Sequence, residues 1–266
     1  MTHQPDLHRD PAESARLQRR TNRRTTAITV AAWATAGAVV VGATQFGWGP
    51  FSGGLGGLAD VAGGAQGERT TTIAEPVTSL TVTSSNVDVV VRYDDVPSAQ
   101  IIETDLAEGG LTHRVEAGRL VVAHDAQGSW WRWFSDERLT VVLPAALEAD
   151  TPDVTVTATT ADILVRGAFG SADLTAQTGS VEGEGTYERF MARTTTGSID
   201  LRGTAGEVVA EAQTGSVDVR PANATHVRAT TSTGSVDIEV TGGLPTEVMA
   251  RTGTGSVDIE VIDITD

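Results

Sequence analysis

The feature that most constrains the fold is a short phrase that occurs five times in the second half of the chain. Each copy reads threonine, glycine, serine, an aliphatic residue and an acidic residue, and the glycines are Gly179, Gly197, Gly215, Gly234 and Gly255. The spacings are therefore 18, 18, 19 and 21 residues. Recurrence at a nearly fixed period of this length is typical of repeat proteins whose units stack on their neighbours.

Around each glycine, apolar or small residues alternate with polar ones. The position two residues after the glycine is occupied by Val181, Ile199, Val217, Val236 and Val257. Alternation with a period of two on both sides of a Thr-Gly turn predicts two half-buried strands in each repeat. A single repeat cannot bury its inward face alone, so we expect stacked repeats to share one continuous core. The glycine is expected where the chain turns, because that place needs a permissive backbone.

Weaker copies of the strand half lie upstream, at Ser84–Val91 and Thr159–Val165. Between them, we predict strands at Ile101–Thr104, Arg119–Ala123 and Leu139–Leu143, the last closed by Pro144. The fold class is therefore predicted to be all-β, a β-solenoid or β-helix-like stack of 18–21-residue repeats over residues 73–265. The early coils are expected to be irregular and the late coils regular. A two-sheet sandwich is the alternative, but a sandwich does not predict such constant recurrence.

The N-terminal part has a different composition. Residues 1–24 carry six arginines against three acidic residues, whereas the whole chain has a formal net charge of -16. Residues 25–46 contain no charged residue, and they are long and apolar enough for one transmembrane helix. The preceding arginines predict a cytoplasmic N-terminus and an extracytoplasmic C-terminal domain. A cleaved secretory signal and a buried core helix are the alternatives to this anchor.

Residues 47–72 begin with a glycine-rich run, which predicts a flexible tether between the membrane helix and the repeat domain. The predicted organisation is thus a cytoplasmic Arg-rich head at 1–24, a transmembrane helix at 25–46, a tether at 47–72 and a β-solenoid at 73–265. Because the part beyond the head is strongly acidic, it repels phosphate backbones, and nucleic-acid binding is excluded as a function class.

The segment Thr140–Pro144 (TVVLP), followed by repeated [TS]-G-[ST]-[VI]-[DE]-[VIL] phrases, resembles the bacterial putative adhesin family, a domain-of-unknown-function family of β-strand repeats. The resemblance covers residues 73–262. It implies a β-strand repeat domain, often behind a single membrane helix. It supplies no catalytic residues.

The position three residues after each glycine is acidic in every copy. It is occupied by Glu182, Asp200, Asp218, Asp237 and Asp258, and a serine precedes the aliphatic residue each time. In an in-register stack these carboxylates form an outward ladder of like charges at the strand spacing of about 4.8 Å. Bound Ca²⁺, solvent and salt, or nearby arginines (Arg193, Arg202, Arg220 and Arg251) are the candidates for compensation. A ladder that is merely solvated, a cation-binding ladder and a partner-binding surface all remain open.

A second unusual segment is Ser129–Phe134 (SWWRWF), with the candidate partner-binding residues Trp130, Trp131, Trp133 and Phe134. Exposed, these aromatics form an anchor for a glycan, a protein or a membrane interface. Buried, they close one end of the stack. The sequence leaves both interpretations open.

We expect no enzymatic activity, because the acidic residues repeat uniformly instead of converging at one repeat and the chain has no cysteine. No catalytic residue and no cofactor are assigned, with Ca²⁺ as the single cation considered. The predicted function is a membrane-anchored extracytoplasmic domain that binds an unknown surface protein or glycan, or scaffolds the envelope. The alternatives are a self-assembling structural module and a Ca²⁺-stabilised binding platform.

Overall fold

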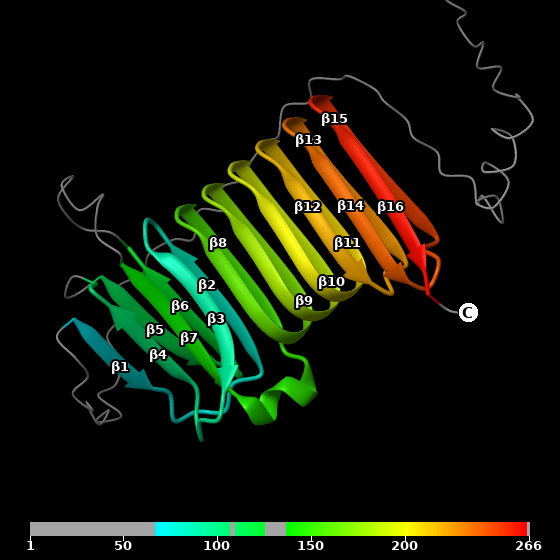
Figure 1. Cartoon of the computed structure of the whole chain (residues 1–266). Coiled ribbons are helices and arrows are strands. Elements are labelled where there is room, and N and C mark those ends of the chain that lie inside the picture. The colour runs from blue at the N-terminus through cyan, green and yellow to red at the C-terminus, as the bar shows by residue number, and fades with distance from the viewer. Residues whose placement is uncertain (1–66, 107–109, 126–136, 265–266) are drawn as a thin grey trace, which may run out of the picture. The chain divides into compact units, whose positions relative to one another are not determined.

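Parallel strands joined by repeated tight turns make up the second half of the molecule. The structure is a computed structural model that describes residues 67–106, 110–125 and 137–264. The strands of its regular part are β9 (Ile163–Thr178), β10 (Val181–Thr196), β11 (Ile199–Thr214), β12 (Val217–Ala222), β13 (His226–Thr233), β14 (Val236–Gly242), β15 (Glu247–Thr254) and β16 (Val257–Asp263). Figure 1 shows them lying side by side along the stack.

The pairing is parallel and in register from coil to coil. Val217 pairs with Ile199 on one side and with Val236 on the other, and Val236 pairs with Val257. The valine column predicted from the phrase is therefore confirmed. In β9, β10 and β11 the strand that follows one Thr-Gly turn is fused with the strand that precedes the next turn, which gives one bent strand of 16 residues. The later coils keep these two strands apart, as β12 with β13 and β14 with β15.

The strands form two layers that enclose the core. We call the layer that contains β13 and β15 the first layer, and the layer that contains β12, β14 and β16 the second layer; each long strand contributes one half to each layer. Val181, Ile199, Val217 and Leu201 are fully buried between them. The predicted inward columns are thus the core, apart from the last coil, where Val257 is 38% exposed.

The earlier part of the chain continues both layers in a less regular way. It contains β1 (Glu68–Thr72), β2 (Ser79–Ser84), β3 (Asp88–Asp94), β4 (Gln100–Thr104), β5 (Leu111–Glu116), β6 (Arg119–His124), β7 (Arg138–Pro144), the 3-10 helix η2 (Ala145–Asp150) and β8 (Asp153–Thr160). The predicted strands at 101–104, 119–123 and 139–143 are confirmed. The strand region begins at Glu68, so residues 68–72, assigned to the tether, belong to the sheet, where β1 pairs with β4.

The early coils are not stacked in chain order. The strand β2 lies between β6 and β8, and β3 lies between β7 and β9. The coil of β2 and β3, which comes first in the chain, therefore stacks directly on β8 and β9, and the later coil of β6 and β7 stacks on its far side. Antiparallel strands extend this end, with β4 on β7, β1 on β4 and β5 on β6. The expected contrast between irregular early coils and regular late coils is confirmed.

Aromatic side chains fill the core where the early and late coils meet. The rings of Tyr93, Phe169, Tyr187 and Phe190 follow one another at centroid distances of 5.1, 6.2 and 5.2 Å. The Tyr187 hydroxyl donates to the Val165 carbonyl at 2.8 Å, which satisfies its buried polar group. Gly183 makes room for Phe190, because a Cβ there would lie 2.4 Å from Cε2 of that ring.

The predicted head (1–24), the membrane helix (25–46) and the tether up to residue 66 lie outside the described residues. Among the residues that are described, no helix has the length and hydropathy needed to cross a membrane.

Candidate interaction surface

The repeated turns stack into one edge of the molecule, which we call the turn edge. Its Thr178, Thr196, Thr214 and Thr233 pair in register, and all are exposed. The glycine that follows each threonine has a positive φ, as at Gly215 with φ +140°. A Cβ on Gly215 would lie 1.8 Å from the carbonyl oxygen of Gly197, so the close approach of successive turns requires glycine.

Backbone hydrogen bonds lock each turn to the next. The Gly197 N–H donates to the Thr214 carbonyl at 3.0 Å, and the Ile199 N–H donates to the Ser216 carbonyl at 3.0 Å. The same two bonds recur from turn to turn along the stack. The serine side chains at this edge consequently stand in a column, which continues upstream through Asp162 and Asp88.

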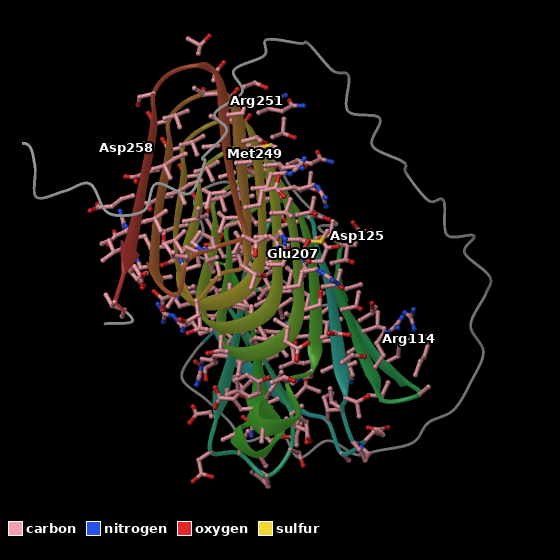
Figure 2. The ribbon with its side chains drawn as sticks, turned by 90° about the vertical axis from the view of Figure 1, so that its right-hand side faces the viewer. Arg114, Asp125, Glu207, Met249, Arg251 and Asp258 are labelled. Carbon is pink, nitrogen blue, oxygen red and sulfur yellow. The ribbon has the colours of Figure 1, made fainter. Side chains whose placement is uncertain are left out.

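The acidic ladder (Glu182, Asp200, Asp218, Asp237 and Asp258) lies beside this column on the outer face of the second layer. Each of its members pairs directly with the next, as the sequence predicted. Glu182, Asp200 and Asp218 are half-buried, whereas Asp237 and Asp258 are exposed. Figure 2 shows Asp258 on one flank of the stack and Met249 and Arg251 on the other.

Arginines compensate part of this charge. One carboxylate oxygen of Asp200 accepts from Arg202 at 2.8 Å, and one of Asp218 accepts from Arg220 at 2.7 Å. Two of the predicted counter-charges are therefore confirmed as partners of the ladder. The other two, Arg193 and Arg251, lie in the first layer, since Arg193 pairs with Glu211 in the half of β11 that pairs with β13, and Arg251 on β15 pairs with β13. They therefore do not compensate the ladder, which lies on the second layer.

The second oxygens of two ladder aspartates are not compensated. Oδ1 of Asp200 and Oδ1 of Asp218 are buried and have no hydrogen-bond partner among the described residues. Burial raises the pKa of Asp218 above its ordinary value, with the charges of Asp200 and Asp237 adding to the effect and Arg220 opposing it. Burial likewise raises the pKa of Glu182, followed by its hydrogen bond with Glu184. The charged forms of Glu182 and Asp218 are thus disfavoured by their burial in the ladder.

No group of three or more histidine, aspartate and glutamate side chains in the described ranges is arranged to hold a metal ion. Cation binding by Asp200, Asp218, Asp237 and Asp258 stays a prediction, because a ladder of single carboxylates is a different arrangement from a closed ligand set. The predicted aromatic anchor (Trp130, Trp131, Trp133 and Phe134) lies outside the described residues.

Sequence reasoning missed two features of this surface. Asp162 and Asp88 occupy the serine column, and their carboxylates accept from the N–H groups of Ser180 at 2.7 Å and Asp162 at 3.0 Å. The first-layer flank also carries a groove of about 120 Å³ between Glu207, His226, Arg228 and Met249. The two aspartates could have been found by aligning the upstream segments with the repeated phrase. The groove could not, because no pattern in the sequence indicates how the polar side chains of neighbouring strands pack on the outer face.

No protein-family model and no curated protein sequence matches the chain. Its structure is similar to a crystal structure described as a putative adhesin from Bacteroides fragilis, with 14% identity, 73% of this chain and 98% of that chain covered, and a TM-score of 0.46. A putative cell adhesion protein from Clostridium sporogenes is 11% identical, with 73% and 98% covered and a TM-score of 0.37.

A structure described as a putative lipid binding protein from Parabacteroides distasonis is 13% identical, with 74% of this chain and 98% of that chain covered and a TM-score of 0.31.

Proposed function

We propose that this chain is a non-enzymatic interaction domain that presents its turn edge and acidic ladder to a protein or glycan at the cell surface. The observation that carries the proposal is the in-register column of exposed threonines and serines beside a column of carboxylates. Hydroxyls and carboxylates at a constant spacing offer the same hydrogen-bonding pattern many times over. Such a surface suits a partner with a repeated polar structure.

Rigidity supports this role. Successive turns are tied by two backbone hydrogen bonds each, and glycine lets them approach to van der Waals contact. A partner that binds the turn edge therefore meets side chains that are already ordered, which lowers the entropic cost of association. The charges are distributed along the stack, which favours a binding surface over one catalytic centre.

In this proposal, residues 25–46 anchor the protein in the cell membrane, with the arginine-rich head in the cytoplasm and the solenoid outside. The basis is the uncharged run and its flanking arginines. Residues 47–66 then supply the reach that lets the solenoid stand away from the bilayer.

The test places a photo-crosslinking amino acid in the full-length chain on cells. Ser198 and Ser216 are positions on the turn edge, and Thr186 and Thr204, which pair with each other at the opposite bend of the coil, are matched controls. We expect capture of the same surface protein or glycan from both turn-edge positions and little capture from the controls. Equal capture from both edges, or no capture from either, would contradict the proposal.

A further inference from the structure

The last coil of the stack has an open edge. Among the described strands, β16 pairs with β14 alone and β15 pairs with β13 alone, so each leaves one side of its backbone without a strand partner. The core is also incompletely covered there, since Val257 is 38% exposed whereas Val217 and Val236 in the same column are 0% and 1% exposed. An additional strand would cover this edge.

Ion pairs connect successive coils of the stack. Arginines of one coil bind glutamates of the following coil in four pairs: Arg166 with Glu184 at 2.6 Å, Arg189 with Glu207 at 2.9 Å, Arg193 with Glu211 at 3.1 Å and Arg220 with Glu239 at 3.4 Å. Opposite charges on directly paired or diagonal positions stabilise neighbouring strands, and like charges destabilise them. The strand that follows any coil is therefore selected partly by its charge.

The final coil departs from this pattern on the second-layer face. Where Arg202 and Arg220 stand in earlier coils, the last two coils carry Glu239 and Glu260. Asp258 and Glu260 are exposed, and no arginine of the described residues pairs with either of them. A strand added beside β16 thus meets two carboxylates on one face and the ends of Val257, Ile259 and Val261 on the other.

We propose that the open edge of β16 binds an extended segment of a partner protein that carries basic residues at alternate positions and apolar residues between them. Its backbone adds one parallel or antiparallel strand to the second layer, and its basic side chains neutralise Asp258 and Glu260. Backbone hydrogen bonds supply affinity in this mode of recognition, and alternate side chains supply specificity. The inference goes beyond the proposed function, because it uses the end of the stack and not the turn edge.

A second copy of the chain fits this edge poorly. Two β16 edges that met antiparallel would bring Asp258 and Glu260 of both copies together, and like charges facing across strands are unfavourable. The second layer has its other open edge at β1. On β1, the residues on the same face as the ladder are Glu68, Thr70 and Thr72, and none of them is basic, so this edge of a second copy could not neutralise Asp258 and Glu260. Charge complementarity therefore favours a different, basic partner.

The test measures fluorescence anisotropy with the full-length chain in detergent micelles and two labelled peptides. The first peptide copies Val236–Gly242 (VDIEVTG) with Asp237→Arg and Glu239→Arg; the second has the natural sequence. The natural sequence is the matched control, because it has the same length and apolar positions. We expect the arginine peptide to bind and the natural peptide not to bind. Equal binding, or binding of neither, would overturn the inference.

Two charge-reversed chains separate the edge from general attraction to an acidic protein. Glu260→Arg removes one edge carboxylate, and Glu188→Arg makes the same change at an exposed site on β10, far from β16 in the stacking order. We expect at least tenfold weaker binding of the arginine peptide to Glu260→Arg and unchanged binding to Glu188→Arg. Equally weaker peptide binding in both variants would show that the peptide is attracted nonspecifically to an acidic protein, and it would contradict the inference.

Sedimentation of the chain alone completes the test. A monomer between about pH 7 and pH 8 is expected, whereas a dimer that Glu260→Arg abolishes would show that a second copy occupies the edge and would overturn the choice of partner. Neither result bears on the turn edge, whose crosslinking at Ser198 and Ser216 is scored separately. Failure of peptide binding with retained crosslinking would reject this inference and leave the proposed function standing.

Discussion

The early coils and the late coils build the same two layers by different means. Late coils repeat one turn, in which a glycine such as Gly215 packs on the preceding glycine and a serine follows. Early coils place Ala161 in the glycine column and aspartates in the serine column. They also include antiparallel strands, and their coils do not stack in chain order. Where the turns are identical, the coils therefore stack in the order in which they follow one another along the chain. Where the turns vary, side-chain hydrogen bonds connect the turns, and pairing between strands distant in sequence determines the stacking order.

The largest expected effect comes from a substitution that blocks the repeated turn. Gly215→Ala forces a Cβ to within 1.8 Å of the Gly197 carbonyl oxygen at a backbone conformation that only glycine adopts readily. We expect the free energy of unfolding to fall by about 3 kcal/mol or more. Chemical denaturation measures it.

The control for this variant is Gly243→Ala, since a Cβ on Gly243 meets nothing within 4 Å. We expect its stability to stay within about 0.5 kcal/mol of the natural chain. Similar losses in both variants would mean that the regular turns do not depend on close contact between glycines.

The junction between the two regions is tested by Phe190→Ala. The Phe190 ring is fully buried beside Tyr187 and fills the space that Gly183 leaves open. Its removal leaves a cavity, and we expect a loss of about 3–5 kcal/mol of stability. Val257→Ala in the partly exposed last coil should cost well under half of that. Thermal unfolding followed by circular dichroism compares the two; equal losses would mean that the junction core is not tightly packed.

A smaller effect separates the two kinds of turn. Asp162→Ala removes the carboxylate that accepts from the Ser180 N–H at 2.7 Å, and we expect it to cost about 0.5–1 kcal/mol. Ser216 occupies the same column in a late coil, and its hydroxyl makes no hydrogen bond to the described residues, so Ser216→Ala should be nearly neutral. Urea titration resolves the pair. An equal cost for both would remove the distinction drawn between early and late turns.

The smallest expected effect concerns pH. Asp218 has a raised pKa in the folded protein, so its ionised form lowers stability, and the cost disappears as the pH falls through that raised pKa. We expect Asp218→Asn to raise the melting temperature slightly at pH 7, by less than about 1 kcal/mol in stability, and to have no effect below about pH 4.

Asp94 in the early coils gives the opposite sign. Its side chain accepts a hydrogen bond from Arg92, which lowers the pKa of the carboxyl, so Asp94 contributes stability above its unfolded pKa that is lost as the pH falls. Asp94→Asn should therefore lower the melting temperature at pH 7 and converge with the natural chain in acid. Shifts of the same sign in both variants would contradict the electrostatic difference between the two regions.

The regular half of the fold was predictable because its turns are local and identical. The positions of Val181, Ile199, Val217 and Val236, and the register of the acidic ladder, follow directly from aligned glycines. The insertion of β2 between β6 and β8 was not predictable, since it depends on pairing between segments that share no phrase. Nor did the sequence reveal that Arg193 and Arg251 lie on the opposite flank, because that required knowing that the strands before and after each Thr-Gly turn lie in different layers.

The most direct test of the in-register stack uses the absence of cysteine from the chain, which leaves no background disulfides. Ser216 pairs with Ser235 in the next coil, and Ser256 follows one coil further. Adjacent strands lie about 4.8 Å apart, within the Cα range of a disulfide, whereas positions two coils apart exceed about 7 Å. Under oxidation, Ser216→Cys with Ser235→Cys should form a bond, and Ser216→Cys with Ser256→Cys should not. A bond in the second pair but not in the first would contradict the stack.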